Sequence, residues 1–287
     1  MDSSFVDPGA TPANGGTTGH FALLEAYKDK VVELFPLIPR ACIDTWALND
    51  VDALALSRFL ESYPVESKAV MLEIGAFVGV STFHLASQQK VSKVLSVDIN
   101  PTFADELEWC ERLTGVKLDL ETVRHLRVLD VAGTVLEHFP DQRQKVDFVS
   151  GTVESVDLPA STDGAPLVAF VDGDHRKRAV KTDLHTIFEN NPLTVAILHD
   201  VAKYHGDSVL AGVTSFLEDS SGEYRFRLFK ESGFRHRPNV GVLYPEVLAD
   251  QVEQATAELL ADPTLEWLRA RRHVVRLRKR LRELEQG

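Results

Sequence analysis

The sequence predicts an α/β fold: a doubly wound, mostly parallel sheet of seven strands that closes with an antiparallel edge pair. Five short apolar runs alternate with stretches of helical spacing, which is typical of repeated βα units. Two more apolar runs then follow each other with no helical stretch between them, and this indicates an antiparallel pair. At 287 residues and 44% hydrophobic content, the chain can bury a large core.

Helical segments come before the first predicted strand. Apolar residues recur at three- and four-residue steps in residues 21–35. The segment 49–64 has Asn49 or Asp50 placed to cap a helix and Pro64 to end it. We expect residues 21–66 to form helices that act as a lid, and residues 1–20, rich in Gly, Thr and Pro, to form a disordered tail.

The five apolar runs are continuous, whereas half-exposed strands would alternate with polar residues, so we expect buried parallel strands. They occupy residues 69–75, 93–100, 145–151, 167–174 and 194–200, and the edge pair is expected at 224–230 and 239–245. Helices are expected at 81–89, 103–113, 177–188 and 209–218. Residues 114–145 fit either an inserted helix or an extra strand with a helix. A C-terminal helical extension, 246–287, completes the chain and is broken near Asp262 and Pro263.

Composition limits the classes of partner and compartment. A net charge of −12 argues against a general nucleic-acid binder. The sequence contains no run of eighteen apolar residues, so no membrane-spanning helix is predicted. The segment 269–287 has eight Lys and Arg against two acids; we interpret it as a solvated or docking helix face, with a nucleic-acid or membrane patch as the alternative. Cys42 and Cys110 fit neither a disulfide framework nor a metal motif, and no signal peptide is evident, so a cytoplasmic location is expected.

A glycine turn follows the first predicted strand, in "EIGAFVGVST". Ligands of open α/β sheets bind at this end of the strands, where Gly75 and Gly79 let the backbone approach a ligand closely. Asp98, at the end of the next strand, is placed to accept hydrogen bonds from a ribose. Such a pattern is compatible with NAD, FAD or S-adenosylmethionine (SAM). The three residues between the glycines, in place of GxGxxG, and the preceding Glu73 favour SAM, because a carboxylate suits an ammonium group better than a diphosphate.

The stretches "VMLEIGAFVGVSTFHLA" and "VLSVDIN" resemble the SAM-binding motifs of class I methyltransferases. This resemblance implies a Rossmann-like fold and a SAM-binding methyltransferase domain at residues 67–245. The turn "SGTVES" is similar to the one that lines the adenine in O-methyltransferases. Carried onto this sequence, the cofactor-binding positions are Glu73, Gly75, Ala76, Gly79, Ser81, Asp98, Gly151, Thr152, Val153 and Asp172.

Two later stretches, "FVDGDHRKRAVKTDL" and "VAILHDV", resemble small-molecule O-methyltransferases of the cephalosporin hydroxylase-like and macrolide-sugar group. The resemblance implies a divalent metal held by Asp172, His199 and Asp200. Mg²⁺ prefers oxygen ligands, so His199, where relatives carry a carboxylate or amide, favours a softer ion such as Mn²⁺, Fe²⁺ or Zn²⁺. It also implies that His175 is the general base. The alternative is that His175 or Asp174 only caps the helix that begins near Arg176.

Methyl transfer from a sulfonium requires that the acceptor be aligned and lose its proton, and a base beside a cation serves both needs. We therefore expect a SAM-dependent O-methyltransferase that acts on a small hydroxylated, natural-product-like acceptor and assembles as a homo-oligomer through its terminal helices. An enzyme that transfers or cyclises the aminocarboxypropyl part of SAM is the alternative. A non-catalytic interaction protein of the same fold is a further one. A nicotinamide dehydrogenase is the weakest, because GxGxxG is absent.

Overall fold

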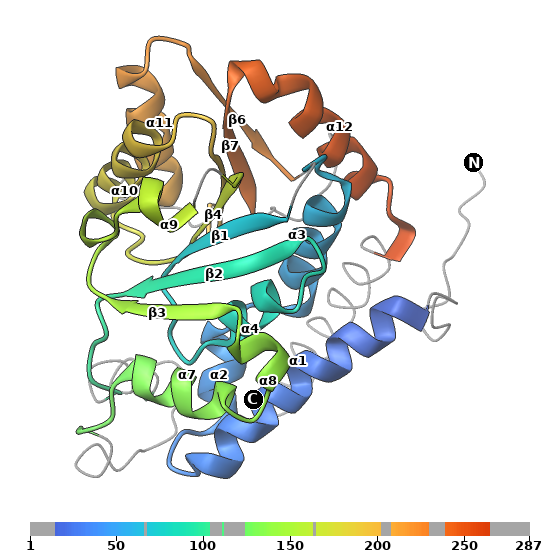
Figure 1. Cartoon of the computed structure of the whole chain (residues 1–287), viewed down its shortest axis with the longest axis vertical. Helices are drawn as coiled ribbons and strands as arrows, with labels where there is room; N and C mark the ends of the chain where they lie inside the picture. The colour runs from blue at the N-terminus through green and yellow to red at the C-terminus, as the bar shows by residue number, and fades with distance from the viewer. Residues whose placement is uncertain are drawn as a thin grey trace, which may run out of the picture.

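A computed structural model describes residues 15–65, 68–103, 111, 124–162, 165–201, 208–229 and 239–264. Within these residues, a seven-stranded sheet has the order β3-β2-β1-β4-β5-β7-β6 (Figure 1). Strands β1 to β5 pair in parallel, and β7 pairs antiparallel with both β5 and β6, which confirms the predicted sheet and its edge pair. The strands are β1 Ala69–Ile74, β2 Val91–Asp98, β3 Val146–Ser150, β4 Leu167–Val171, β5 Val195–Leu198, β6 Tyr224–Leu228 and β7 Gly241–Pro245.

Helices cover both faces of the sheet (Figure 1). One face packs against α1 Gly15–Leu34, α2 Arg40–Trp46, α3 Asp50–Ser62, α4 Val80–Ala86, α7 Val128–Leu136, α8 Pro140–Arg143 and α12 Ala249–Leu260. The other face packs against α9 Leu158–Thr162, α10 Lys177–Asn190 and α11 Val209–Asp219. Two 3₁₀ turns, η1 Val153–Ser155 and η2 Glu246–Leu248, complete the described elements.

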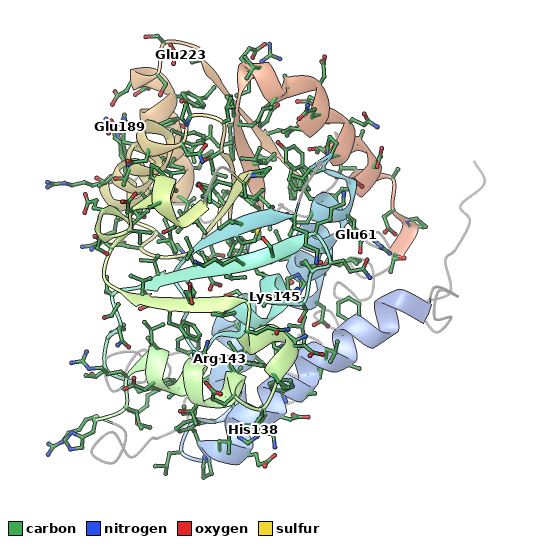
Figure 2. All side chains as sticks on the ribbon, in the orientation of Figure 1. Glu61, His138, Arg143, Lys145, Glu189 and Glu223 are labelled. Carbon is green, nitrogen blue, oxygen red and sulfur yellow. The ribbon has the colours of Figure 1, made fainter. Side chains whose placement is uncertain are left out.

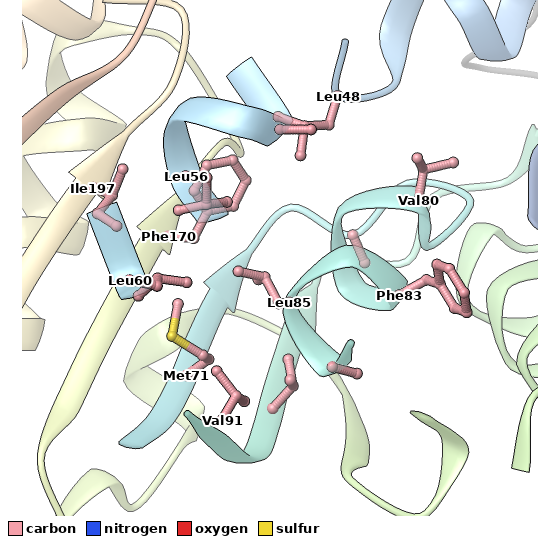
Figure 3. Packing of buried hydrophobic residues seen from close by; sticks show 14 of the residues in the cluster. Leu48, Leu56, Leu60, Met71, Val80, Phe83, Leu85, Val91, Phe170 and Ile197 are labelled. Carbon is pink, nitrogen blue, oxygen red and sulfur yellow. The ribbon is translucent and has the colours of Figure 1, made fainter. Parts of the chain in front are cut away.

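The two cores meet across the sheet because neighbouring side chains of a strand point to opposite faces. In β1, Met71 belongs to one cluster of buried side chains and Leu72 to the other. Helix α3 contributes directly to the first cluster: Figure 3 shows its Leu56 and Leu60 beside Phe170 of the sheet. Helix α3 is therefore part of the core, and the lid role expected of residues 21–66 stays a prediction.

Charged side chains lie at the periphery. Glu61, Glu189 and Glu223 are exposed (Figure 2), whereas the Lys145 ammonium donates hydrogen bonds to the carbonyl groups of Ala86 and Gln88 and so ties the start of β3 to the end of α4. Of the helices that the structure describes, none has both the length and the apolar content that crossing a membrane requires.

Several expected boundaries differ. Helix α1 begins at Gly15, inside the expected tail, and residues 1–14 lie outside the described residues. In the described part of 114–145 the chain forms helices α7 and α8, and extended pairing is limited to one antiparallel bridge, between Thr102 and Arg127. Most of the helix expected at 103–113 and the basic segment 269–287 also lie outside the described residues.

The expectation for the cysteines needs a correction. Cys42 is buried and disulfide-bonded. The sequence has one other cysteine, Cys110, which lies outside the described residues. The two cysteines of the sequence form no spacing motif, which is why the sequence did not indicate the bond.

Candidate functional site

The predicted site residues follow strand ends that lie side by side at one edge of the sheet. The backbone amides of Gly75, Gly151, Asp172 and His199 each donate to a carbonyl of the neighbouring strand end, on Val97, Asp98, Ile74 and Val171, at 2.8–3.0 Å. The parallel register of β3, β2, β1, β4 and β5 therefore brings together residues that are far apart in the sequence. This edge carries most of the site residues that the sequence predicts.

The glycine turn between β1 and α4 has the conformation that its glycines predict. Gly75 and Gly79 have φ angles of 91° and 79°, which glycine adopts without steric cost. A Cβ on Gly75 would lie 2.5 Å from the Asp172 carbonyl oxygen, and one on Gly79 would lie 2.5 Å from the Tyr27 hydroxyl. The turn is thus packed directly against the end of β4 on one side and against α1 on the other.

Asp98 ends β2 and faces this turn. Its Oδ2 accepts hydrogen bonds from the backbone amides of Ala76, at 2.9 Å, and Phe77, at 3.3 Å, while Oδ1 accepts from the amide of Asn100. The next residue, Ile99, exposes 72% of its surface although it is apolar. The sequence analysis did not single out Ile99; the available signal was an isoleucine directly after Asp98.

The turn after β3 lies beside Asp98. Gly151 has a φ of 150°, and a Cβ there would lie 2.7 Å from the Ser155 hydroxyl oxygen. Thr152 precedes the 3₁₀ turn η1, and Val153 is buried at its start. The proposed ribose and adenine positions are therefore neighbours at the ends of β2 and β3.

Glu73 lies within β1 and is fully buried. Its Oε2 accepts hydrogen bonds from the hydroxyl groups of Thr82 and Ser96, and Ser81 also hydrogen-bonds to the carboxyl group. Among the described residues, none hydrogen-bonds to Oε1. Burial raises the pKa of this carboxyl to about 7, although the three hydroxyl groups oppose the shift.

Two histidines contact the carboxylate of Asp172, at the end of β4. His199 Nδ1 lies 2.9 Å from Asp172 Oδ1, and His175 Nε2 lies 3.3 Å from the same oxygen. Burial disfavours the charged form of Asp172, but the two imidazoles outweigh this effect and lower its pKa well below the usual range. His175 keeps 38% of its side chain exposed, whereas His199 keeps only 9%.

Both ring nitrogens of His199 are engaged. Its Nε2 lies 3.1 Å from Oδ2 of Asp52, a buried residue in the first turn of α3. Burial disfavours the imidazolium, but the carboxylates of Asp172 and Asp52 raise the pKa of His199 well above its ordinary value. The imidazole therefore bridges two acids that are far apart in the sequence.

Asn239, just before β7, closes the cluster on its other side. Its Nδ2 donates to Asp200 Oδ1 at 2.8 Å and lies 3.4 Å from Asp52 Oδ2. Asp200 has a φ of 54°, a left-handed backbone that is uncommon outside glycine and typical of functional sites. Sequence reasoning missed Asp52 and Asn239; the signal for Asp52 was an acid placed between the apolar residues Val51 and Ala53 of a helical stretch.

The predicted metal ligands are only partly grouped as expected. Among the described residues, ligand atoms of Asp172, His175 and Asp200 lie within 4.8 Å of one another. His175 takes the place of His199 in this group, and the two nitrogens of His199 lie within hydrogen-bonding distance of Asp172 and Asp52. The oxygen and imidazole donors of the three-residue group fit a divalent cation such as Mn²⁺ or Zn²⁺.

The alternative role of His175, to cap helix α10, does not match the structure. Helix α10 has Arg176 at its N-cap, and no side chain makes a capping hydrogen bond there. The Asp174 carboxylate accepts from the amide and guanidinium of Arg176 before the helix begins. The His175 ring instead lies toward Asp172 and Asp200, 3.7 Å from Asp200 Oδ2 through Nδ1.

Comparison with solved structures finds O-methyltransferases. TomG of Streptomyces achromogenes, a tomaymycin-synthesis enzyme in complex with SAM, is 15% identical, with a TM-score of 0.47 over 77% of this chain and 88% of TomG. An O-methyltransferase of Bacillus cereus in complex with SAH (S-adenosylhomocysteine) is 14% identical, with a TM-score of 0.48 over 83% of this chain and 94% of its own. These likenesses are too weak to carry an argument about substrate. No curated protein sequence matches significantly.

A family model described as a methyltransferase domain matches residues 72–201. The match begins in β1 and ends just beyond β5, so it contains the glycine turn, Asp98, Asp172 and the His199-Asp200 pair. It confirms the resemblance drawn from these same motifs. Residues 72–201 therefore form a methyltransferase domain, and the chain is an enzyme of the predicted class, a SAM-dependent methyltransferase.

Proposed function

We propose that the protein transfers the methyl group of SAM to a hydroxyl oxygen of a small acceptor, with His175 as the general base. The observation that carries the proposal is the His175-Asp172 pair at the end of β4, next to the glycine turn. A base at this place lies beside the expected position of the methyl donor. A partly exposed imidazole backed by a largely buried carboxylate is an arrangement by which many enzymes remove a proton.

The contacts of His175 support different roles for its two nitrogens. Nε2 lies 3.3 Å from Asp172 Oδ1, so a proton on Nε2 is donated to this carboxylate. Nδ1 lies 3.7 Å from Asp200 Oδ2, beyond hydrogen-bonding distance, and keeps its lone pair available. Asp172 in this way fixes the tautomer that can accept a proton from the acceptor.

The reaction then balances in one displacement. The acceptor O–H bond breaks and its proton passes to His175 Nδ1, while the oxygen forms a bond to the methyl carbon. The bond between this carbon and the sulfonium sulfur breaks, and its electrons stay on sulfur in S-adenosylhomocysteine. The chain's part is to align the acceptor and hold the base, since alignment and proton removal are what the step requires.

For the cofactor, we propose that Gly75, Ala76, Gly79, Ser81 and Glu73 surround the methionine part of SAM. Asp98 would accept hydrogen bonds from the ribose hydroxyls in place of those that it accepts from the backbone amides of Ala76 and Phe77. Gly151, Thr152 and Val153 would line the adenine. Support comes from the adjacency of these positions at one sheet edge and from the free Oε1 of Glu73, which is a buried acceptor.

The group of Asp172, His175 and Asp200 supports a second role, the binding of a divalent cation. A bound cation would polarise the acceptor oxygen and lower its pKa. A metal-bound His175 nitrogen has no lone pair for a proton, so the two roles of this nitrogen exclude each other. Methyl transfer that survives chelation supports His175 as the base, whereas a loss that Mn²⁺ or Mg²⁺ restores favours the cation.

Three expectations accompany this proposal. The catalytic unit extends over residues 67–245, with 21–66 as the lid and 246–287 as an extension. The enzyme forms a homo-oligomer through its terminal helices. It is cytoplasmic. The disulfide of Cys42 is a feature that is more common in oxidising compartments.

The experiment that tests the proposed function is an assay of the purified protein with SAM and a panel of phenols, catechols and hydroxylated sugars. Formation of S-adenosylhomocysteine and an O-methylated product supports the proposal. Release of methylthioadenosine would favour transfer or cyclisation of the aminocarboxypropyl group instead. Intact SAM with every acceptor, despite tight binding, would point to an acceptor outside this class.

A further inference from the structure

We propose that Asp52, on α3 and outside the matched methyltransferase domain, is a positioning residue for the catalytic base. It acts through His199 and Asp172, so the inference rests on the proposed function of His175. The chain of contacts runs from Asp52 Oδ2 to His199 Nε2, at 3.1 Å, from His199 Nδ1 to Asp172 Oδ1, at 2.9 Å, and from this oxygen to His175 Nε2, at 3.3 Å.

The first contact fixes the orientation of an imidazole. A histidine ring has two nitrogens, and the ring can rotate to direct either of them at a partner unless both are hydrogen-bonded. Asp52 and Asp172 hold opposite nitrogens of His199, and the side chains of Asp52 and His199 are only 8% and 9% exposed. The ring therefore has little freedom, and its Nδ1 stays directed at Asp172.

The contact between His199 and Asp172 in turn orients the base, His175. Asp172 Oδ1 serves both His199 and His175, so a shift of the His199 ring moves the carboxylate that selects the tautomer of His175. Asp52 Oδ2 also lies 3.4 Å from Nδ2 of Asn239, which donates to Asp200 at 2.8 Å. Asp52 thus contacts His199, which binds Asp172, and Asn239, which binds Asp200; these two acids flank the base.

A purely structural role explains this placement less well. The side chain of Asn49 caps α3 by accepting from the amides of Val51 and Asp52, and its Nδ2 also donates to Oδ2 of Asp52. The cap itself comes from Asn49 and does not require the contact between Asp52 and His199. A buried carboxylate loses its hydration, and stability alone is usually served as well by an apolar residue of similar size. The position of Asp52 against His199 is therefore best explained by what His199 does for the site.

The test is a double-mutant cycle with Asp52→Ala, His199→Gln and the double variant, assayed by methyl transfer. Loss of a residue that orients a functional ligand typically costs about 10- to 100-fold in activity. We expect Asp52→Ala to lower kcat by about this factor with the KM for SAM unchanged, and to cause no further loss in the His199→Gln background. Asp52→Asn should recover most of the lost rate, because its amide oxygen accepts a hydrogen bond from His199.

The matched control is Asp50→Ala, which removes an exposed carboxylate from the same helical turn and should leave kcat unchanged. Equal losses in Asp50→Ala and Asp52→Ala would mean that both act through helix stability. Fully additive losses in the double variant would mean that Asp52 does not act through His199. Either result overturns the inference.

A second readout separates this inference from the proposed function. If the wild-type protein methylates none of the acceptors, the proposed function fails, and Asp52 is then judged by NMR of histidine labelled with ¹⁵N. The ring signals of His199, assigned by their absence in His199→Gln, should shift in Asp52→Ala and stay in place in Asp50→Ala. Unchanged His199 signals in Asp52→Ala would overturn the inference without any activity measurement.

Discussion

At the scale of single residues, the site depends on one carboxylate that is shared by two histidines. Asp172 is largely buried, yet its pKa is lowered, because His175 and His199 stabilise its charge. The two imidazoles differ in what they can do next. His199 has carboxylates at both nitrogens, whereas His175 has a partly exposed ring with Nδ1 out of hydrogen-bonding range of Asp200.

Replacement of the proposed base tests this difference. His175→Ala should lower kcat by about 10²- to 10⁴-fold, because the acceptor proton then has no positioned base. Affinity for SAM, measured by calorimetry, should stay nearly the same. His185→Ala is the control, since His185 lies on α10, the helix that follows His175, and contacts Asp219 at 3.2 Å, away from the site. A fully active His175→Ala enzyme would assign the base elsewhere.

Glu73 gives a prediction about stability and pH. Its pKa is raised from 4.5 to about 7 in the folded protein, so the folded state binds a proton that the unfolded state releases between these values. The contribution of Glu73 to stability is therefore fully present below pH 4.5 and is lost as the pH rises through 7. Glu73→Gln removes the ionisation and should be more stable than the wild type at pH 8, by up to about 3 kcal/mol.

Urea unfolding at several pH values measures this effect. The stability difference between Glu73→Gln and the wild type should shrink as the pH falls toward 4.5. Glu61→Gln, at an exposed glutamate, should show no such trend. A difference that is constant from pH 5 to pH 8 would mean that Glu73 does not take up a proton on folding.

At the scale of elements, the glycine turn connects the proposed cofactor site to Asp172. The close approach of Gly75 to the Asp172 backbone leaves no room for a side chain, and its φ of 91° disfavours any other residue. Gly222 has a similar φ of 84°, but a Cβ there would meet nothing within 4 Å. The two positions separate backbone strain from steric overlap.

Alanine substitution at both glycines uses this contrast. Gly222→Ala should cost about 1 kcal/mol in unfolding free energy, from strain alone. Gly75→Ala should cost more, because the added carbon overlaps the Asp172 carbonyl, and it should also weaken SAM binding. Unfolding by urea and calorimetry with SAM measure both effects. Equal losses of unfolding free energy at the two positions would show that the Asp172 backbone can shift to accommodate the added carbon.

Elements with local signals were predictable from the sequence. The strands follow from continuous apolar runs, and the turn follows from Gly75 and Gly79, because both depend on residues that are close in sequence. The Asp52-His199 contact joins residues that are 147 positions apart, and Asn239 reaches Asp200 from another element. No periodicity encodes such contacts, since they arise only when α3 packs on the sheet. For the same reason, the sequence did not indicate the bond of Cys42. It also did not indicate that His175, in place of His199, lies in one group with Asp172 and Asp200.

At the scale of the whole molecule, the functional unit is larger than the matched methyltransferase domain. Residues 72–201 supply the strand ends, but Asp52 and Asn239 lie on either side of them in the sequence and contact the same cluster. Helix α3 also packs against α12, so the N-terminal and C-terminal segments meet over one face of the sheet. Arg58 and Asp262 strengthen this contact with an ion pair at 2.6 Å.

The central claim is that this molecule transfers the methyl group of SAM. The most direct measurement is mass spectrometry of the nucleoside formed when the wild-type enzyme is incubated with SAM and the panel of hydroxylated acceptors, with and without a chelator. We expect S-adenosylhomocysteine, formed only when an acceptor is present, together with an acceptor heavier by one methylene unit. Methylthioadenosine as the product, with no methylated acceptor, would contradict it.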